Sequence, residues 1–390
     1  MNFITLEPEV FREYAKKSPY RSFTQTPEIA KLREQNGWTA YYFGVEQNGE
    51  LRAATMLIAK PTFLGKSTFF APGGPLLDFE DTALVDFFFK HLRQYLKTHN
   101  GYNLIIDPNY QLIERDRAGE PVESGFNRKK AIQNLKSFGF TKLKTDSTPH
   151  YQFVLNLENQ TSDQLFTDMK RNTRNHIRKA EKMGVTVREL KREELGIFKQ
   201  ITESTSNRRH FADKPLSYYE QMYDLFHERG EVMFVMAGVS EDTLSRSIFA
   251  DGANTERPSP VTTGARERSE KDVSLIPLSV AMFILYGSEV IYLFSGSDEQ
   301  YMKEYNAQYL IQWHMIKYAV EHKYKTYNFY GIQGLPDKAS KDYGIYDFKK
   351  GFTSETTGKV IELIGDYELP VNSIFYRLHQ ILSKIKKHRS

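Results

Sequence analysis

The sequence predicts an α/β (α+β) protein built from two copies of one strand–helix–strand module. At 68–107 and again at 290–329, a short apolar run is followed by a glycine-containing turn, a segment with apolar residues at helical spacing, and a second apolar run. The length of 390 residues suits two domains of ordinary size. A content of 40% hydrophobic and 26% charged residues excludes disordered and fibrous classes.

The elements of the first module follow from local pattern. Asn48-Gly49 between two apolar runs predicts a hairpin with a type I′ turn. Gly73-Gly74 follows a strand, but Pro75 lacks the amide that a phosphate-binding loop would use, so a structural turn is favoured. The expected elements are hairpin strands at 40–45 and 51–59, a strand at 68–71, a helix at 82–99, a strand at 103–107, and a helix-to-strand step at 130–142.

The polar stretch Asp146–Pro149 is interpreted as the divide between the modules. We expect residues 1–150 to form the first module, completed by about 361–390, and residues 151–360 to form the second. The segment 240–272 has little periodicity and is predicted to be a surface loop. The second module is expected to hold a helix-to-strand step at 218–237, a strand at 290–294, a helix at 308–322 and a strand at 326–329.

The composition excludes several kinds of chemistry. The chain has no cysteine, which rules out disulfides, thiolate metal sites and thioester intermediates. It also lacks a phosphate-binding P-loop, an H-E-x-x-H motif and a G-x-S-x-G elbow, and its 10 histidines are scattered, so we expect no metal and no cofactor. The longest apolar stretch, 275–286, is too short for a membrane helix, and we expect a cytoplasmic protein.

Basic residues are concentrated in two places, although the net charge is only +4. Residues 170–192 contain nine lysines and arginines against two glutamates, and the tail ends with Lys384, Lys386, Lys387 and Arg389. Such runs suit polyanions such as RNA or anionic lipid, or form a solvated helix face.

Several blocks spread over the whole chain carry a resemblance to one family. They are Ser18-Pro19-Tyr20 with Thr24-Gln25, Ile29–Arg33 and Trp38, Phe70–Asp78, Ile106-Asp107-Pro108, Asn175–Gly184, Tyr305-Asn306-Ala307, Tyr330-Gly331-Ile332 and Tyr346–Lys349. In this order they resemble the Fem (FemABX) peptidyltransferases, including MurM- and MurN-like enzymes. The resemblance implies two GNAT-like acyltransferase modules in tandem.

The same resemblance implies a function and partners. Fem enzymes transfer an amino acid from aminoacyl-tRNA to the stem-peptide lysine or the nascent bridge of a peptidoglycan precursor, either lipid II or UDP-MurNAc-pentapeptide. We therefore expect transfer of Ala, Ser or Gly by a monomer that contacts the inner face of the plasma membrane. Two alternatives stay open: an acyl-CoA N-acyltransferase, which the absence of an R/Q-x-x-G-x-G/A loop disfavours, and a non-catalytic protein that binds tRNA or precursor.

Family positions carry over to individual residues of this chain. The precursor site implied by the resemblance consists of Arg33, Tyr102, Lys214, Tyr218 and Phe294, where relatives have a tyrosine in place of Phe294. Basic residues from two elements suit the paired charges of a diphosphate.

The catalytic positions implied by the resemblance are Asp107, Phe348 and Lys349. Lys349 is expected to stabilise the oxyanion of the tetrahedral intermediate, and Asp107 to accept the proton of the attacking amine or to orient it. Phe348 is expected to wall the site or to stack on the terminal adenine, or else to be a core residue.

The chain departs from the family at one place. The long coiled-coil arm that the family inserts is not predicted here, because the corresponding stretch has no heptads and contains Pro258 and Pro260. We therefore assign tRNA contact to a helix over 170–192, on which Arg171, Arg174, Arg178 and Lys182 share one face, with Ile177, Ala180 and Met183 on the buried side.

Overall fold

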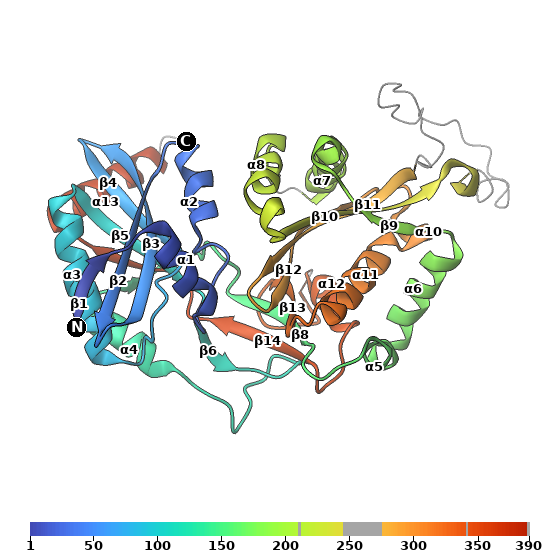
Figure 1. Cartoon of the computed structure of the whole chain (residues 1–390), viewed down its shortest axis with the longest axis horizontal. Coiled ribbons are helices and arrows are strands. Elements are labelled where there is room, and N and C mark those ends of the chain that lie inside the picture. Colours follow the sequence, from blue (N-terminus) through green and yellow to red (C-terminus); the bar gives the residue numbers. More distant parts are fainter. Residues whose placement is uncertain (210–211, 245–274, 341, 388–390) are drawn as a thin grey trace. The chain divides into compact units, whose positions relative to one another are not determined.

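The computed structural model describes residues 1–209, 212–244, 275–340 and 342–387 (Figure 1). Contacts divide the chain into two compact units. The first unit holds Met1–Asn156, Leu285–Ile291 and Thr326–Ser390, and the second holds Leu157–Ile284 and Tyr292–Lys325. None of the helices described is long and apolar enough to cross a membrane.

A sheet with strand order β1-β2-β3-β4-β5-β15-β7 forms the centre of the first unit. The β4–β5 pair is parallel over seven residue pairs, while its other described pairs are antiparallel. Its strands are β1 (Asn2–Thr5), β2 (Thr39–Gln47), β3 (Glu50–Phe63), β4 (Lys66–Gly73), β5 (Gly101–Pro108), β7 (Thr141–Lys142) and β15 (Tyr367–Pro370).

Helices pack against both faces of this sheet. Helices α1 (Pro8–Lys17) and α2 (Pro27–Glu34) contact β2 and β3, and Figure 1 shows them on the face opposite α3 (Thr82–Thr98). Helix α3 contacts β5 and α4 (Lys129–Phe138), and α13 (Ser373–Lys387) contacts β5. The core consists of strand residues such as Leu57 and Leu104 packed against the apolar stripe of α3, which includes Val85, Phe88 and Leu92.

The predicted hairpin is confirmed. Strands β2 and β3 pair in antiparallel fashion around Asn48 and Gly49, whose φ angles of 54° and 80° are those of a type I′ turn. The turn after β4 is structural, because a side chain on Gly74 would collide with Gln25, whose amide bonds to Met56 and Pro72.

The second sheet has the order β6-β14-β8-β13-β12-β11-β10-β9. Its β12–β13 pair is parallel and spans Glu289–Ile291 with Thr326–Asn328. The strands are β6 (Gln111–Glu114), β8 (Tyr151–Asn156), β9 (Thr186–Glu189), β10 (Val232–Ser240), β11 (Leu275–Tyr286), β12 (Glu289–Ser297), β13 (Thr326–Ile332) and β14 (Gly358–Leu363).

The helices that follow along the chain pack within their own units. In the second unit α11 contacts β9, β10, α5 and α6, and α8 contacts α7 and β10; in the first unit α12 contacts β8 and β13. Their bounds are α5 (Ser162–Asp168), α6 (Arg171–Lys182), α7 (Leu195–Arg209), α8 (Leu216–Phe226), α10 (Met302–Tyr305), α11 (Ala307–Glu321) and α12 (Tyr343–Lys350), with short 3₁₀ helices at Arg192–Glu194 and His227–Arg229.

The duplicated strand–helix–strand pattern is confirmed. It corresponds to β4-α3-β5 and to β12-α11-β13, and in both copies the two strands are parallel neighbours. The copies differ in how far the strands stay paired, with seven residue pairs in the first and three in the second.

The basic helix is shorter than predicted. Helix α6 ends at Lys182, because Gly184 follows in the left-handed region with φ 73°, and the chain enters β9 at Thr186. The expectation of one helix over 170–192 is therefore wrong beyond residue 182. Most of the predicted loop at 240–272 lies outside the described residues.

Candidate functional site

Lys349 is a buried lysine on α12 that bonds to backbone carbonyls. Its side chain is 6% exposed, and Nζ donates to the carbonyl oxygens of Gly331 at 2.5 Å and Tyr330 at 3.3 Å. Among the described residues no carboxylate forms an ion pair with it, and burial lowers the pKa of the ammonium to about 7. Lys349 therefore changes its charge near neutral pH.

A bulge in β13 presents the two carbonyls. Tyr330 adopts φ 62°, and the pairing of β13 with β8 shifts register between Asn328 and Gly331. The side-chain oxygen of Asn328 accepts a hydrogen bond from the Tyr330 amide at 2.7 Å, which holds this left-handed conformation. Gly331 is required here, because a Cβ would lie 2.6 Å from Pro149.

Glu289 extends this hydrogen-bonded chain. The Asn328 amide nitrogen donates to Glu289 at 3.0 Å and to Gln152 at 2.8 Å. Burial raises the pKa of the Glu289 carboxyl to about 7, while Asn328 and Arg21 oppose the rise. Two groups that titrate near neutral pH, Glu289 and Lys349, are thus joined through Asn328 and the Tyr330 backbone.

Asn328 and Glu289 were not expected from the sequence. Tyr330-Gly331-Ile332 belongs to the family resemblance, and a glycine inside an apolar strand is the local signal for a bulge. The partners of that bulge come from β12 and α12, which lie about 20 to 40 residues away in the chain, so local pattern cannot find them.

Phe348 lies next to Lys349 on α12 and is half-buried. Its ring meets that of Phe352 edge-on, with centroids 5.3 Å apart. A partly exposed ring beside the buried amine fits a wall of the site better than a core position, and its role toward substrate stays a prediction.

Asp107, at the end of β5, is 4% exposed and lies beside a second buried carboxyl, Asp366. Thr148 donates to Asp107 at 2.6 Å, and the amide and hydroxyl of Ser147 donate to Asp366 at 2.9 and 2.6 Å. Burial, followed by the charge of Asp366, raises the pKa of Asp107 well above its usual range. A carboxyl that is shielded from solvent and bonded to Thr148 suits positioning of the 147–148 segment, and its role toward the attacking amine stays a prediction.

The two other first-unit positions implied by the resemblance differ in exposure. Arg33 is exposed near the end of α2. Tyr102 is 2% exposed, and its ring packs 5.2 Å from that of His379 on α13. A buried Tyr102 anchors α13 to β5, and contact between its side chain and a precursor stays a prediction.

Three predicted precursor-binding residues come together within the second unit. The Lys214 ammonium lies 5.5 Å from the ring centroid of Tyr218, and that ring meets Phe294 edge-on at 6.2 Å. Lys214 is exposed, whereas Tyr218 and Phe294 are half-buried. The result is a cation beside an aromatic surface, which suits a ligand with both anionic and planar groups.

Asp213 holds the backbone that carries Lys214. Its carboxylate accepts from Tyr219 at 2.6 Å, Lys199 at 2.9 Å and Thr202 at 3.0 Å. These bonds outweigh burial, so the pKa of Asp213 is lowered. Asp213 is therefore a structural anchor of this site that no local sequence pattern indicates.

Tyr292 lies two residues before Phe294 on β12, and its hydroxyl is already engaged. It donates to Ser295 at 2.5 Å and accepts from Gln308 at 2.8 Å. Both bonds lie within the second unit.

The basic face of α6 divides into two kinds of residue. Arg171, Arg178 and Lys182 are exposed, whereas Arg174 is half-buried and donates to the carbonyls of Met169, at 2.7 Å, and Thr167 at the end of α5. The Arg178 guanidinium lies 5.2 Å from the ring centroid of Phe166.

The opposite side of α6 is buried as predicted at Ile177 and Ala180. Met183 is half-buried.

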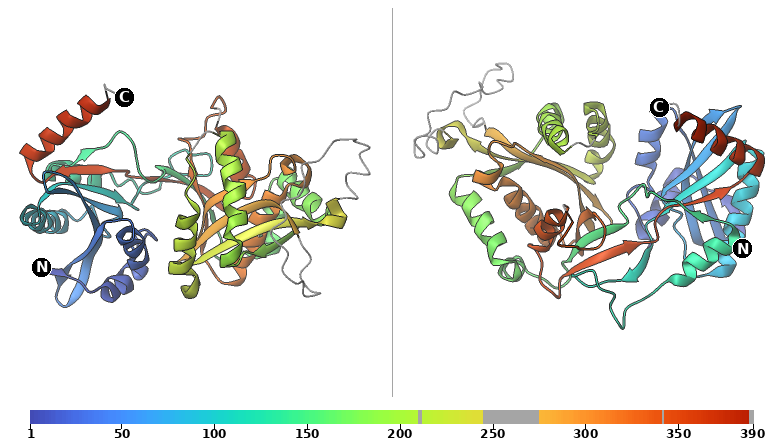
Figure 2. Two further views of the ribbon diagram at one scale, coloured as in Figure 1. Left: turned by 90° about the horizontal axis from the view of Figure 1, so that it is seen from above. Right: turned by 180° about the vertical axis from the view of Figure 1, so that it is seen from behind.

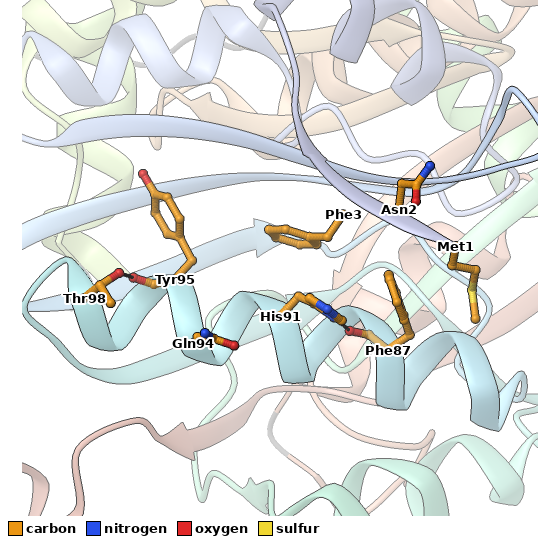
Figure 3. A pocket seen from close by; sticks show the side chains of 8 residues that line it. All are labelled: Met1, Asn2, Phe3, Phe87, His91, Gln94, Tyr95 and Thr98. Carbon is orange, nitrogen blue, oxygen red and sulfur yellow. Dashed lines mark hydrogen bonds between the residues drawn. The ribbon is translucent and has the colours of Figure 1, made fainter.

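A hollow of about 560 Å³ lies elsewhere in the first unit (Figure 3). Residues of β1 and α3 line it, among them Phe3, His91 and Tyr95, and His91 bonds to the Phe87 carbonyl at 2.8 Å. The lining includes neither a charged side chain nor any predicted site residue, so this hollow does not fit the chemistry above.

Known proteins that resemble the chain cover nearly all of it. The sequence model of the FemAB family matches residues 6–257 and 253–384. The aminoacyltransferase FemA of Staphylococcus epidermidis is 28% identical over 425 residues, covering 99% of this chain and 100% of the relative. FemA of Staphylococcus aureus strain MRSA252 is 29% identical over 422 residues, covering 99% of each.

Solved structures show the same fold. The crystal structure of FemX superposes with a TM-score of 0.77 at 22% identity, covering 97% of this chain and 99% of FemX. A tandem GNAT protein from the clavulanic acid biosynthesis pathway superposes with a TM-score of 0.50 at 11% identity, covering 95% of this chain and 98% of its own. The predicted fold of two GNAT-like modules in tandem is confirmed. The chain belongs to the FemAB family, and it is an aminoacyltransferase.

Proposed function

We propose that this protein transfers Ala, Ser or Gly from aminoacyl-tRNA to the stem-peptide lysine, or to the nascent bridge, of lipid II or UDP-MurNAc-pentapeptide. The reaction would build the interpeptide bridge of peptidoglycan. Membership of the FemAB family and the aminoacyltransferase activity of its FemA relatives support the proposal.

The observation that carries the mechanism is the buried Lys349. A 6%-exposed ammonium with two carbonyl partners and no counter-ion among the described residues is costly to keep, and such groups concentrate at active sites. In aminoacyl transfer the acceptor amine attacks the ester carbonyl, a C–N bond forms, and the C–O bond to the ribose breaks. The amine proton ends on the released ribose hydroxyl.

Protonated Lys349 would stabilise the negative charge that develops on the carbonyl oxygen and on the departing ribose oxygen. A fixed donor in a water-poor site contributes about 10²–10³ to the rate of such a step. Because the pKa of Lys349 is about 7, an approaching anion easily draws it into the charged form.

The two substrates would be held by different groups. Lys214, Tyr218 and Phe294 provide a cation beside an aromatic surface for the precursor. The family resemblance assigns Arg33, an exposed cation of the first unit, to the same ligand. The exposed Arg171, Arg178 and Lys182 on α6 suit the tRNA backbone, whereas Arg174, which bonds to a backbone carbonyl, mainly supports the helix.

Donor competition with purified protein tests the proposal. Alanyl-, seryl- and glycyl-tRNA and acetyl-CoA would each be offered with UDP-MurNAc-pentapeptide and, separately, with lipid II, and products would be identified by mass spectrometry. We expect an adduct with at least one aminoacyl-tRNA and none with acetyl-CoA. Acetylation alone would establish an acyl-CoA transferase, and binding of tRNA and precursor without any adduct would establish a non-catalytic protein.

A further inference from the structure

Helix α13 presents an apolar stripe to solvent. Ile374, Leu378, Ile381 and Leu382 are 71%, 42%, 56% and 47% exposed. At 3.6 residues per turn they fall within an arc of about 100°, on one side of the helix. Figure 2 shows α13 as a rod on the outside of the first unit's sheet.

The opposite side of α13 attaches it to the sheet. Tyr376 donates to Glu368 of β15 at 2.5 Å, and the His379 ring packs 5.2 Å from that of Tyr102 on β5. Phe375, Tyr376 and His379 are half-buried. The apolar stripe is therefore not needed to hold the helix in place.

A second exposed apolar residue lies beside this helix. Leu64, at the tip of the β3–β4 hairpin, is 75% exposed and adopts φ 51°. The two elements are neighbours, because the Lys66 ammonium lies 4.9 Å from the ring centroid of Phe375. Asparagine or glycine is usual in a left-handed turn, so an exposed leucine at this position indicates a role other than stabilising the fold.

The charged side chains of the C-terminal segment, histidines aside, all have one sign. The segment 373–390 contains three lysines and two arginines and no aspartate or glutamate. Arg377, which is exposed, lies on α13 itself. An amphipathic helix with exposed leucine and isoleucine and a surplus of basic residues is the pattern of an interfacial membrane helix.

We propose that α13 and the Leu64 tip dock on an anionic phospholipid bilayer. Aliphatic side chains enter the boundary between headgroups and acyl chains, and each basic residue near the surface strengthens binding about fivefold. A second copy of the chain fits less well, since a symmetric contact would bring two segments of the same positive charge together. RNA fits less well too, because the aliphatic stripe has no use on a phosphate backbone.

Docking on a bilayer is independent of the proposed transfer reaction. The test is co-sedimentation of the full-length protein with phosphatidylcholine vesicles, with and without phosphatidylglycerol, at increasing salt. We expect binding that requires phosphatidylglycerol and weakens with salt, and we expect Ile374→Ser/Leu378→Ser/Ile381→Ser and Leu64→Asn each to lower it about tenfold or more. Val10→Ser and Leu335→Ser, at positions 49% and 40% exposed, are matched controls that should bind normally.

Three outcomes would overturn the docking proposal. In the first, the triple variant binds vesicles as well as the wild type does. In the second, binding does not depend on phosphatidylglycerol. In the third, the wild type does not bind vesicles but forms a dimer, and the triple variant does not form it. Aminoacyl transfer to soluble UDP-MurNAc-pentapeptide, measured in the same variants, should stay normal. If vesicle binding fails while that transfer persists, only the docking surface is refuted.

Discussion

Among single residues, Lys349 lowers the free energy of unfolding when it is charged. Burial lowers its pKa from 10.5 to about 7, so the folded state binds fewer protons than the unfolded chain between these two pH values. The free energy of unfolding therefore rises with pH across this interval, and the cost of burying the charge is greatest at pH 7 and below.

Lys349→Met should consequently stabilise the protein while abolishing most of its activity. The shift corresponds to roughly 5 kcal/mol as an upper limit, and the absence of the two hydrogen bonds reduces the gain. Urea unfolding at pH 6, 7.5 and 9 would measure the effect, and the gain should shrink as pH rises. A variant that is less stable than the wild type at pH 6 would contradict this interpretation.

Asn328 is predicted to be a positioning residue. Asn328→Ala removes the acceptor of the Tyr330 amide and the donor to Glu289, so the bulge can relax and the carbonyls can move away from Lys349. We expect a loss of about 1–3 kcal/mol of stability and a lower kcat with unchanged precursor affinity.

The pH profile separates positioning from a purely structural role of Asn328. In Asn328→Ala the apparent pKa near 7 in the profile of kcat/KM should move, because the surroundings of Lys349 change. Glu289→Gln, which keeps the hydrogen-bonding geometry, is the matched variant. A lower kcat with the wild-type profile would reduce Asn328 to a structural residue.

Among the elements, the segment just before α8 carries Lys214, and the hydrogen bonds of Asp213 fix its position. Lys214→Ala should weaken binding of UDP-MurNAc-pentapeptide by about 1–3 kcal/mol, since it removes a charge-assisted hydrogen bond to phosphate, and should leave tRNA binding intact. Isothermal titration would measure both affinities. Lys325→Ala, which removes a lysine paired with Glu158 at 3.0 Å, is the control. A selective loss of tRNA affinity in Lys214→Ala would reverse the assignment.

Helix α6 gives a second prediction at this scale. Arg171→Glu/Lys182→Glu changes only exposed positions and should weaken tRNA binding. It should also flatten the salt dependence of binding by about 0.7–0.9 log–log units for each phosphate that is no longer neutralised. Lys130→Glu/Lys136→Glu on α4 is a control with the same change of charge.

Reversal of Arg174 and Arg178 is less informative, because it also breaks the packing of α6 against α5. An unchanged salt slope would leave α6 as a solvated face.

Elements were easier to predict than the site. The hairpin at Asn48-Gly49, the helix of α3 and both strand–helix–strand copies follow from turn residues and periodicity, which are local. The helix over 170–192 was extended too far because basic residues continue past Gly184, where the backbone turns. Lys349 and Phe348 came from the family resemblance, whereas Asn328, Glu289 and Asp213 act through tertiary contacts that no local pattern contains.

At the scale of the whole molecule, two copies of one module have diverged. The parallel strands of the first copy pair along seven residue pairs, and those of the second along three. The bulge at Tyr330 lies in β13 of the second copy, and Lys349 on α12, which follows β13, bonds to it, so we infer that the end of this copy carries the chemistry. In the first copy the corresponding strand β5 ends at the shielded Asp107–Asp366 pair, which suits a structural role.

We propose above all that Lys349 stabilises the transition state of aminoacyl transfer. Single-turnover transfer from aminoacyl-tRNA to UDP-MurNAc-pentapeptide, compared between wild type and Lys349→Met at saturating substrates, tests it most directly. We predict a rate about 10²–10³ lower in the variant, with dissociation constants for both substrates nearly unchanged. A variant that transfers at the wild-type rate, or that loses rate only because it no longer binds a substrate, would contradict the claim.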